Sequence, residues 1–224
     1  MNKKRSVLIT GSNKGLGKEI ALVFANNKFD IILHGRDKKE LEKVQKQISK
    51  MGVNCLSISG DLKSEKTIEK LEKASRENNI SVLVNNAGLH CPNLPLEKLD
   101  DEQISDMIST NLLVPIKLTK RIYKQFIQEG NGTVININSV SGLQNSKLRS
   151  IYSASKWGLR GFSDTLRKEA KDHNVRIIDV YPSRIKTKPE FDRGMESRNV
   201  AQKIYDAYLG KSKDKIILDE RSKI

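Results

Sequence analysis

Tyr152 and Lys156 lie four residues apart in a segment with helical periodicity, so both side chains project from one face of a helix. A phenol with a pKa of about 10 exchanges protons poorly at neutral pH unless its anion is stabilised. A lysine cation nearby, together with a second positive charge bound beside it, favours the phenolate and is expected to lower the pKa of Tyr152 towards neutrality. The pair therefore predicts proton transfer, although this spacing by itself is more typical of a surface helix pair.

Ser139 follows the apolar run 133–137, which has the pattern of a buried strand. At the carboxyl end of a parallel strand its hydroxyl can donate to a substrate oxygen that gains negative charge. The alternative is a turn serine, and Ser141 is the second choice if the register differs. Ser139 is thus a candidate partner of the Tyr152–Lys156 pair.

A glycine-rich turn connects the apolar run 6–10 with the helical pattern 16–26. Its glycines permit a positive φ, let backbone N–H groups approach a pyrophosphate, and allow close packing of helix on strand. The spacing is GxxxGxG and differs from the GxGxxG of many dinucleotide-binding turns. The turn predicts a nucleotide site formed by Gly11, Ser12, Asn13, Lys14, Gly15, Leu16 and Gly17.

The cofactor preference is predicted from the end of the second strand. Gly35 stands where NAD-binding proteins place an acidic residue, and Arg36 follows it. Together with Lys14 in the glycine turn, Arg36 can bind a ribose 2′-phosphate, which favours NADP(H) over NAD(H). The alternative is that both are ordinary surface charges. Asp37 is expected to cap the next helix, with Glu40 at capping-box spacing.

Short apolar runs alternate with amphipathic stretches along the whole chain. Strands are expected at 6–10, 31–34, 54–59, 82–85, 133–137, 176–180 and 215–218, and helices at 16–26, 38–51, 64–78, 101–129, 151–173 and 197–209. Apolar strands separated by helices belong in a parallel sheet covered on both faces. The sequence therefore predicts a single α/β Rossmann-fold domain over residues 1–224, with a doubly wound, mostly parallel sheet of about seven strands and ligands at their carboxyl ends.

Composition limits the class of protein and the cellular compartment that we expect. The 224 residues are 37% hydrophobic and 30% charged, and no run approaches the ~20 apolar residues that span a bilayer. The charged start lacks a signal segment, so we expect a cytoplasmic protein without a membrane partner. Cys55 and Cys91 imply neither a disulfide framework nor a metal cluster.

The formal net charge of +14 comes from 41 Lys and Arg against 27 Asp and Glu. The cations are dispersed and often lie beside acidic residues, and no aromatic-flanked basic block occurs, so a nucleic-acid partner is the less favoured interpretation. An acidic carrier protein stays open as a partner of the basic surface.

Taken together, these motifs resemble the short-chain dehydrogenase/reductase family in order and spacing over nearly the whole chain. They are TGSNKGLG at 10–17, Asp61-Leu62, NNAG at 85–88, Asn111, Ser139, YSASK at 152–156 and the segment from Pro182 to Thr187. The interval of thirteen residues from Ser139 to Tyr152 also matches the family. Ser183 departs from it, because the family has glycine there, and a serine with positive φ would cost about 1 kcal/mol.

The resemblance implies roles for the matched residues. Tyr152 would donate or accept the substrate proton, Lys156 would also hold the nicotinamide ribose, and Asn111 would bend its helix and hold a water between the lysine and solvent. Cofactor contacts would come from Asp61, Leu62, Asn85, Ala87, Gly88, Ile185 and Thr187. The family's helices around 112–129 and 151–173 associate subunits, so a homodimer or homotetramer is expected.

The sequence accordingly predicts an NADP(H)-dependent oxidoreductase that reduces a small ketone or aldehyde, or oxidises the alcohol, with Tyr152 as proton donor. The alternatives are a 3-oxoacyl-carrier-protein reductase and, from another class, a non-catalytic NADP(H)-sensing protein. A sensor has no need of Ser139, Tyr152 and Lys156, which argues against it. Position alone suggests site-lining residues, namely Leu89, His90, Leu143, Phe191 and Met195. For His90, an exposed loop position is the favoured interpretation.

Overall fold

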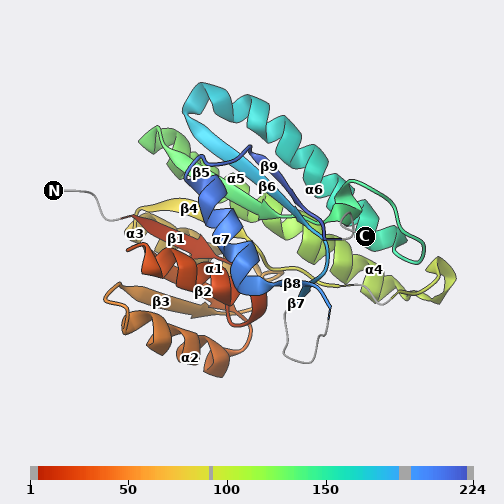
Figure 1. Ribbon diagram of the computed structural model, residues 1–224, viewed down its shortest axis with the longest axis horizontal. Coiled ribbons are helices and arrows are strands. Elements are labelled where there is room, and N and C mark those ends of the chain that lie inside the picture. Colours follow the sequence, from red (N-terminus) through yellow and green to blue (C-terminus); the bar gives the residue numbers. More distant parts are fainter. Residues whose placement is uncertain (1–4, 91–92, 187–192, 221–224) are drawn as a thin grey trace.

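The seven apolar runs expected to form strands all do so, and they pair into one parallel sheet (Figure 1). The computed structural model describes residues 5–90, 93–186 and 193–220. The strands are β1 (Ser6–Ile9), β2 (Asp30–Gly35), β3 (Cys55–Ser59), β4 (Ile80–Asn85), β5 (Gly132–Ile137), β6 (Val175–Pro182) and β9 (Lys215–Leu218). Their order is β3-β2-β1-β4-β5-β6-β9, so the winding direction reverses between β1 and β4. Ligands of such sheets bind in the crevice at this reversal.

Helices cover both faces of the sheet (Figure 1). They are α1 (Gly15–Asn26), α2 (Lys38–Ser49), α3 (Glu65–Glu77), α4 (Asp101–Ile108), α5 (Val114–Glu129), α6 (Ser150–Glu169) and α7 (Ser197–Tyr208). Helices α1, α2 and α7 pack on one face, and α3, α5 and α6 on the other. Val7 and Ile9 of β1 face the first group whereas Leu8 faces the second, which explains why this strand is apolar throughout. The doubly wound Rossmann fold is confirmed.

The single helix expected over 101–129 is interrupted. A π-helical segment, Ser109–Leu113, separates α4 from α5, and it contains the buried Asn111. The Asn111 amide binds both backbone groups of Leu89, with Leu89 N–H donating to Oδ1 (2.7 Å) and Nδ2 donating to the Leu89 carbonyl (3.0 Å). A π segment at this point is typical of a functional position in a helix.

Two short strands that the sequence pattern did not predict follow the sheet strand β6. Strands β7 (Ile185–Lys186) and β8 (Met195–Glu196) pair with each other in parallel. Met195 is buried in the core cluster that includes residues of α7, and its place in the substrate site stays a prediction. Ser183 does not adopt a positive φ, and its N–H donates to the Leu218 carbonyl (2.8 Å), so the serine is accommodated without strain.

Three residues of interest, Cys91, Thr187 and Phe191, lie outside the described residues. Within the described ranges, none of the helices has the length and apolar character that a bilayer crossing requires.

Candidate active site

The glycine turn is held against the loop that follows β4. The Nδ2 of Asn86 donates to the carbonyls of Thr10 (2.8 Å) and Gly11 (3.0 Å). A Cβ on Gly17 would lie 2.3 Å from the Gly11 carbonyl oxygen and 2.4 Å from that Nδ2, so position 17 has no room for a side chain. Gly11 itself has φ +64°. The turn is therefore shaped by a tertiary contact as well as by backbone freedom.

His34 fastens the other side of this turn, and sequence analysis did not single it out. Its Nδ1 accepts from Gly11 N–H (3.5 Å), while its Nε2 lies 3.1 Å from the Gly60 carbonyl, which fixes a neutral ring that donates through Nε2. Burial lowers the pKa of His34 to about 4 and outweighs the hydrogen bond to Gly60 and the Asp61 charge. The ring thus connects β2 with the loops that follow β1 and β3.

The N-terminus of α1 opens beside this turn. Its first helical N–H groups have no acceptor within the helix and, with the helix dipole, form an anion-binding site. Leu16 has a buried side chain, so only its backbone is available to a ligand. The arrangement fits the pyrophosphate of a dinucleotide.

Two basic residues follow the neighbouring strands β1 and β2, Lys14 in the glycine turn and Arg36 directly after Gly35. A Cβ on Gly35 would lie 2.8 Å from the Asn13 Oδ1, so the Asn13 side chain occupies the space that an acidic residue would need. Lys14 and Arg36, the neighbours of these two residues, are both exposed. Asp37 caps α2 as predicted by accepting from Glu40 N–H (3.1 Å), whereas the Glu40 carboxylate pairs with Lys43.

The remaining cofactor candidates line the same edge of the sheet. Asp61 is exposed and accepts from Lys63 N–H (2.8 Å), while Leu62 is buried in the core. Ala87 N–H donates to the Thr10 hydroxyl (3.0 Å), which holds the segment from Ala87 to Gly88 against the end of β1. The Asn85 side chain turns inwards instead, and its Nδ2 donates to Thr119 Oγ1 (2.9 Å) and Asn136 Oδ1 (2.8 Å). Ile185 is half-buried at β7.

Ser139, Tyr152 and Lys156 come together at the carboxyl end of β5. Tyr152 and Lys156 lie on α6 and are buried, with Lys156 Nζ 5.8 Å from the centre of the Tyr152 ring. Ser139 caps a short 3₁₀ turn (Val140–Gly142) by accepting from Ser141 N–H, and its hydroxyl hydrogen-bonds Tyr152. Ser139, and not Ser141, is the serine that meets the tyrosine.

Among the protein groups, burial governs the pKa of Tyr152, and the expected lowering by Lys156 together with a positive nicotinamide ring stays a prediction. Burial raises the pKa of Tyr152, and the Ser139 hydrogen bond and the Arg149 charge only partly oppose this. Lys156 Nζ donates to the Ile137 carbonyl (3.1 Å) and not to the phenol oxygen. Burial lowers the pKa of Lys156 to about 8, because the charged ammonium is less stable in the protein interior than in water.

His90 also contributes to the site. Its ring stacks on Tyr152 with centroids 5.8 Å apart and an interplanar angle of 23°. Loss of solvation, followed by the charges of Lys156 and Arg149, lowers the pKa of His90. The residue is exposed, as expected, yet its ring lies against the Tyr152 phenol ring.

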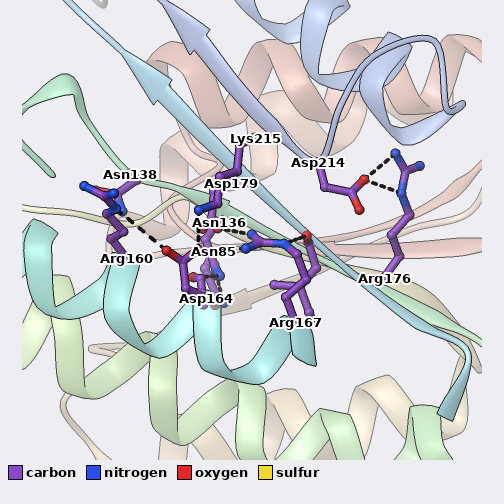
Figure 2. A network of polar contacts seen from close by, with 12 residues as sticks. Asn85, Asn136, Asn138, Arg160, Asp164, Arg167, Arg176, Asp179, Asp214 and Lys215 are labelled. Carbon is purple, nitrogen blue, oxygen red and sulfur yellow. Dashed lines mark hydrogen bonds and ion pairs between the residues drawn. The ribbon is translucent and has the colours of Figure 1, made fainter. Parts of the chain in front are cut away.

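A partly buried polar network connects α6 to the neighbouring strands. Asn136 of β5 accepts from Asn85 and donates to Ser163 Oγ on α6 (2.9 Å). Figure 2 shows Arg167 and Asp164 of α6 reaching Asp179 of β6 and Lys215 of β9, respectively. Burial raises the pKa of Asp179, and the Arg167 charge acts in the opposite direction. These contacts connect α6 to β5, β6 and β9, while Asp179 Oδ1 is buried without a hydrogen-bond partner among the described residues.

An α/β domain with a nucleotide-type glycine turn and a buried Ser–Tyr–Lys group defines a class of nucleotide-binding enzymes, and comparison with known proteins identifies the family. Residues 5–194 match the family model described as short chain dehydrogenase. The chain belongs to this family of oxidoreductases, the short-chain dehydrogenases/reductases.

Individual relatives agree with this assignment. The chain is 34% identical over 193 residues to "Carbonyl reductase family member 4" of Xenopus laevis (85% of this chain, 80% of the relative). It is 32% identical over 210 residues to "NADP-dependent 3-hydroxy acid dehydrogenase" of Schizosaccharomyces pombe (90% and 79%). A solved metagenomic short-chain oxidoreductase in complex with NADP shares 26% identity and a TM-score of 0.84, with 97% of this chain and 98% of that one covered.

Proposed function

We propose that this oxidoreductase uses NADPH to reduce the carbonyl group of a small ketone or aldehyde, or catalyses the reverse oxidation. The observation that carries the proposal is the meeting of Ser139, Tyr152 and Lys156 at the carboxyl edge of the sheet, the edge at which the glycine turn also lies. The nicotinamide, when bound, supplies the hydride. The similarity to a carbonyl reductase and to an NADP-dependent dehydrogenase supports this reaction class.

The protein groups have distinct roles in this proposal. Ser139 donates to the carbonyl oxygen of the substrate as it gains negative charge. Tyr152 gives that oxygen its proton. Lys156 holds the nicotinamide ribose, and its charge favours the phenolate that remains. Asn111 keeps the loop at Leu89 against the helix that faces this group.

The preference for NADPH rests on the end of β2. Lys14 and Arg36 supply the positive charge for a 2′-phosphate, and Gly35 stands where an NAD(H)-binding protein would place a carboxylate. The proposed adenine contact is Asp61. Thr187 and Ile185 belong to the proposed nicotinamide end, and the backbone from Asn85 to Gly88 passes the ribose.

We also include the expected cytoplasmic homodimer or homotetramer in the proposal. Leu113 and Trp157 support it as exposed apolar side chains, 45% and 41% accessible, on the helical segments assigned to subunit contacts. Size-exclusion chromatography with light scattering tests it: a monomer at micromolar concentration contradicts it.

The test of the cofactor is a fluorescence titration with NADPH and NADH. We expect NADPH to bind at least about tenfold more tightly, and Arg36→Ala to remove most of that preference because one charge-assisted contact is lost. Lys39→Ala, an exposed cation three residues further on, is the matched control and should change nothing. Equal affinity for both cofactors overturns the preference.

The test of the reaction is NADPH oxidation across ketones, aldehydes, quinones and 3-oxoacyl thioesters. Turnover of simple carbonyls supports the main proposal. Turnover of 3-oxoacyl thioesters without turnover of simple carbonyls would favour the alternative, a 3-oxoacyl-carrier-protein reductase. NADPH binding without any turnover would identify a cofactor-sensing protein and refute the enzyme.

A further inference from the structure

Asn138 occupies the position between β5 and the catalytic serine, and nothing in the catalytic group as described above uses it. Its side chain is 3% exposed, and its backbone N–H donates to the Val180 carbonyl of β6 (2.8 Å). The main chain of Asn138 is thus fixed to the sheet. Any contact its amide makes with α6 therefore relates the helix to the sheet.

Both ends of the Asn138 amide are engaged. The Oδ1 accepts from Ser139 N–H (2.9 Å), and Nδ2 donates to the Lys156 carbonyl (3.2 Å). A carbonyl oxygen has two lone pairs, so Lys156 can accept this bond in addition to its helical one. One amide therefore connects the backbone of the serine with the backbone of the lysine.

The same two segments are connected a second time in the opposite sense. Lys156 Nζ donates to the carbonyl of Ile137, the residue before Asn138. Each segment thus offers a side-chain donor to a main-chain acceptor of the other. Two such bonds fix both the separation and the rotation of α6 relative to the end of β5, which a single bond would not.

Close packing leaves the amide no other place. A Cβ on Gly142 would lie 2.8 Å from Asn138 Oδ1 and 2.9 Å from the Lys156 carbonyl oxygen. Position 142 must therefore be glycine for the bridge to form. The 3₁₀ turn that Ser139 caps ends at this glycine, so the same glycine is needed both for the turn and for the Asn138 bridge.

We propose that Asn138 is a positioning residue that sets the Ser139 hydroxyl relative to the Tyr152 phenol and the Lys156 ammonium. The inference rests on the proposed role of these three residues in proton transfer. Without the amide, no side chain at position 138 connects the Ser139 backbone to the backbone of α6, so the position of Ser139 relative to the helix is less well fixed. The Ser139–Tyr152 hydrogen bond then weakens.

The chain provides a matched control in Asn136, on the same strand two residues earlier. Its amide is also fully buried and also joins β5 to α6, through Ser163, but it touches neither Ser139 nor Lys156. Asn138→Ala and Asn136→Ala should lose similar stability. Asn136 reaches α6 at Ser163, about two helical turns beyond Lys156, so only Asn138→Ala should disturb the site.

The first readout needs no substrate. The ultraviolet absorbance of the phenolate is titrated in the NADP⁺ complex, and the Tyr152→Phe curve is subtracted to isolate Tyr152. We expect its pKa to rise by about one unit in Asn138→Ala, because the Ser139 hydrogen bond to the phenolate is weakened, and to stay unchanged in Asn136→Ala. An unchanged pKa in Asn138→Ala, or an equal rise in both variants, overturns the proposal.

The second readout is turnover with the best carbonyl from the screen. In Asn138→Ala we expect kcat to fall by about 10- to 100-fold, as misplaced catalytic groups do, with the NADPH Kd within twofold of wild type. In Asn136→Ala kcat should stay within about threefold. Equal losses in both variants mean a merely structural role. If Tyr152→Phe retains turnover, the proposed function itself fails, which is a separate result.

Discussion

Replacing Lys156 with methionine should stabilise the cofactor-free protein at neutral pH while it abolishes turnover. Lys156 is 6% exposed, and burial lowers its pKa from 10.5 to about 8. Its ammonium is therefore less stable in the folded protein than in the unfolded chain. Methionine fills a similar space without a charge.

The magnitude follows from the pKa. A difference of about 2.5 units (10.5 minus 8) corresponds to about 3 kcal/mol of unfolding free energy at pH 7. The lost bond from Nζ to the Ile137 carbonyl offsets about 1 kcal/mol. We expect Lys156→Met to be more stable than wild type by about 2 kcal/mol.

The difference must depend on pH with a definite sign. Because the folded pKa lies below the unfolded one, the penalty is fully present below pH 8 and disappears as the pH rises through 10.5. Wild type and variant should therefore converge between these values.

Urea unfolding at pH 7 and at about pH 10, without cofactor, measures this convergence. Lys168→Met, at an exposed position of the same helix, is the control and should show neither effect. A Lys156→Met protein that is less stable at pH 7, or a difference that is constant with pH, refutes the reasoning.

Two further changes test the walls of the cofactor site. Gly17→Ala should cost about 1–3 kcal/mol and weaken NADPH binding, since its Cβ meets backbone at 2.3 Å, whereas Gly161→Ala, with open space around it, should be neutral or slightly stabilising in urea unfolding. Wild-type affinity in Gly17→Ala would contradict the described turn. His34→Gln should weaken NADPH binding in fluorescence titrations, because the neutral ring joins Gly11 to Gly60. The folded pKa of His34 lies below 6.5, so wild type should lose up to about 3 kcal/mol of stability as pH falls from 6.5 to 4, and a His34→Gln protein with the same acid loss would rule this out.

Much of the fold was predictable because strands buried on both faces are apolar throughout and helices show a 3.6-residue period. All seven sheet strands and the helices α1, α2, α3, α6 and α7 follow from those patterns. The π segment at Asn111 does not, since it depends on a contact with Leu89 more than twenty residues away. Strands β7 and β8 are two residues long and carry no periodicity.

The candidate site was predictable where motif spacing reflects local geometry, as for Tyr152 and Lys156 on one helix face. Its supporting residues were not. In the sequence, His34 has the pattern of an ordinary strand residue and Asn138 that of a turn residue. Only the fold shows that they contact Gly60 and Lys156, respectively. The pKa of Tyr152 also required the structure, because burial and not the lysine dominates it.

The most direct test of the central claim compares NADPH oxidation by wild type and Tyr152→Phe with the same carbonyl substrate, alongside the NADPH Kd of each. Without the phenolic proton we expect kcat to fall by about 10²–10⁴-fold, with cofactor affinity within twofold. A Tyr152→Phe protein that turns over at close to the wild-type rate would contradict the assignment of Tyr152 as proton donor.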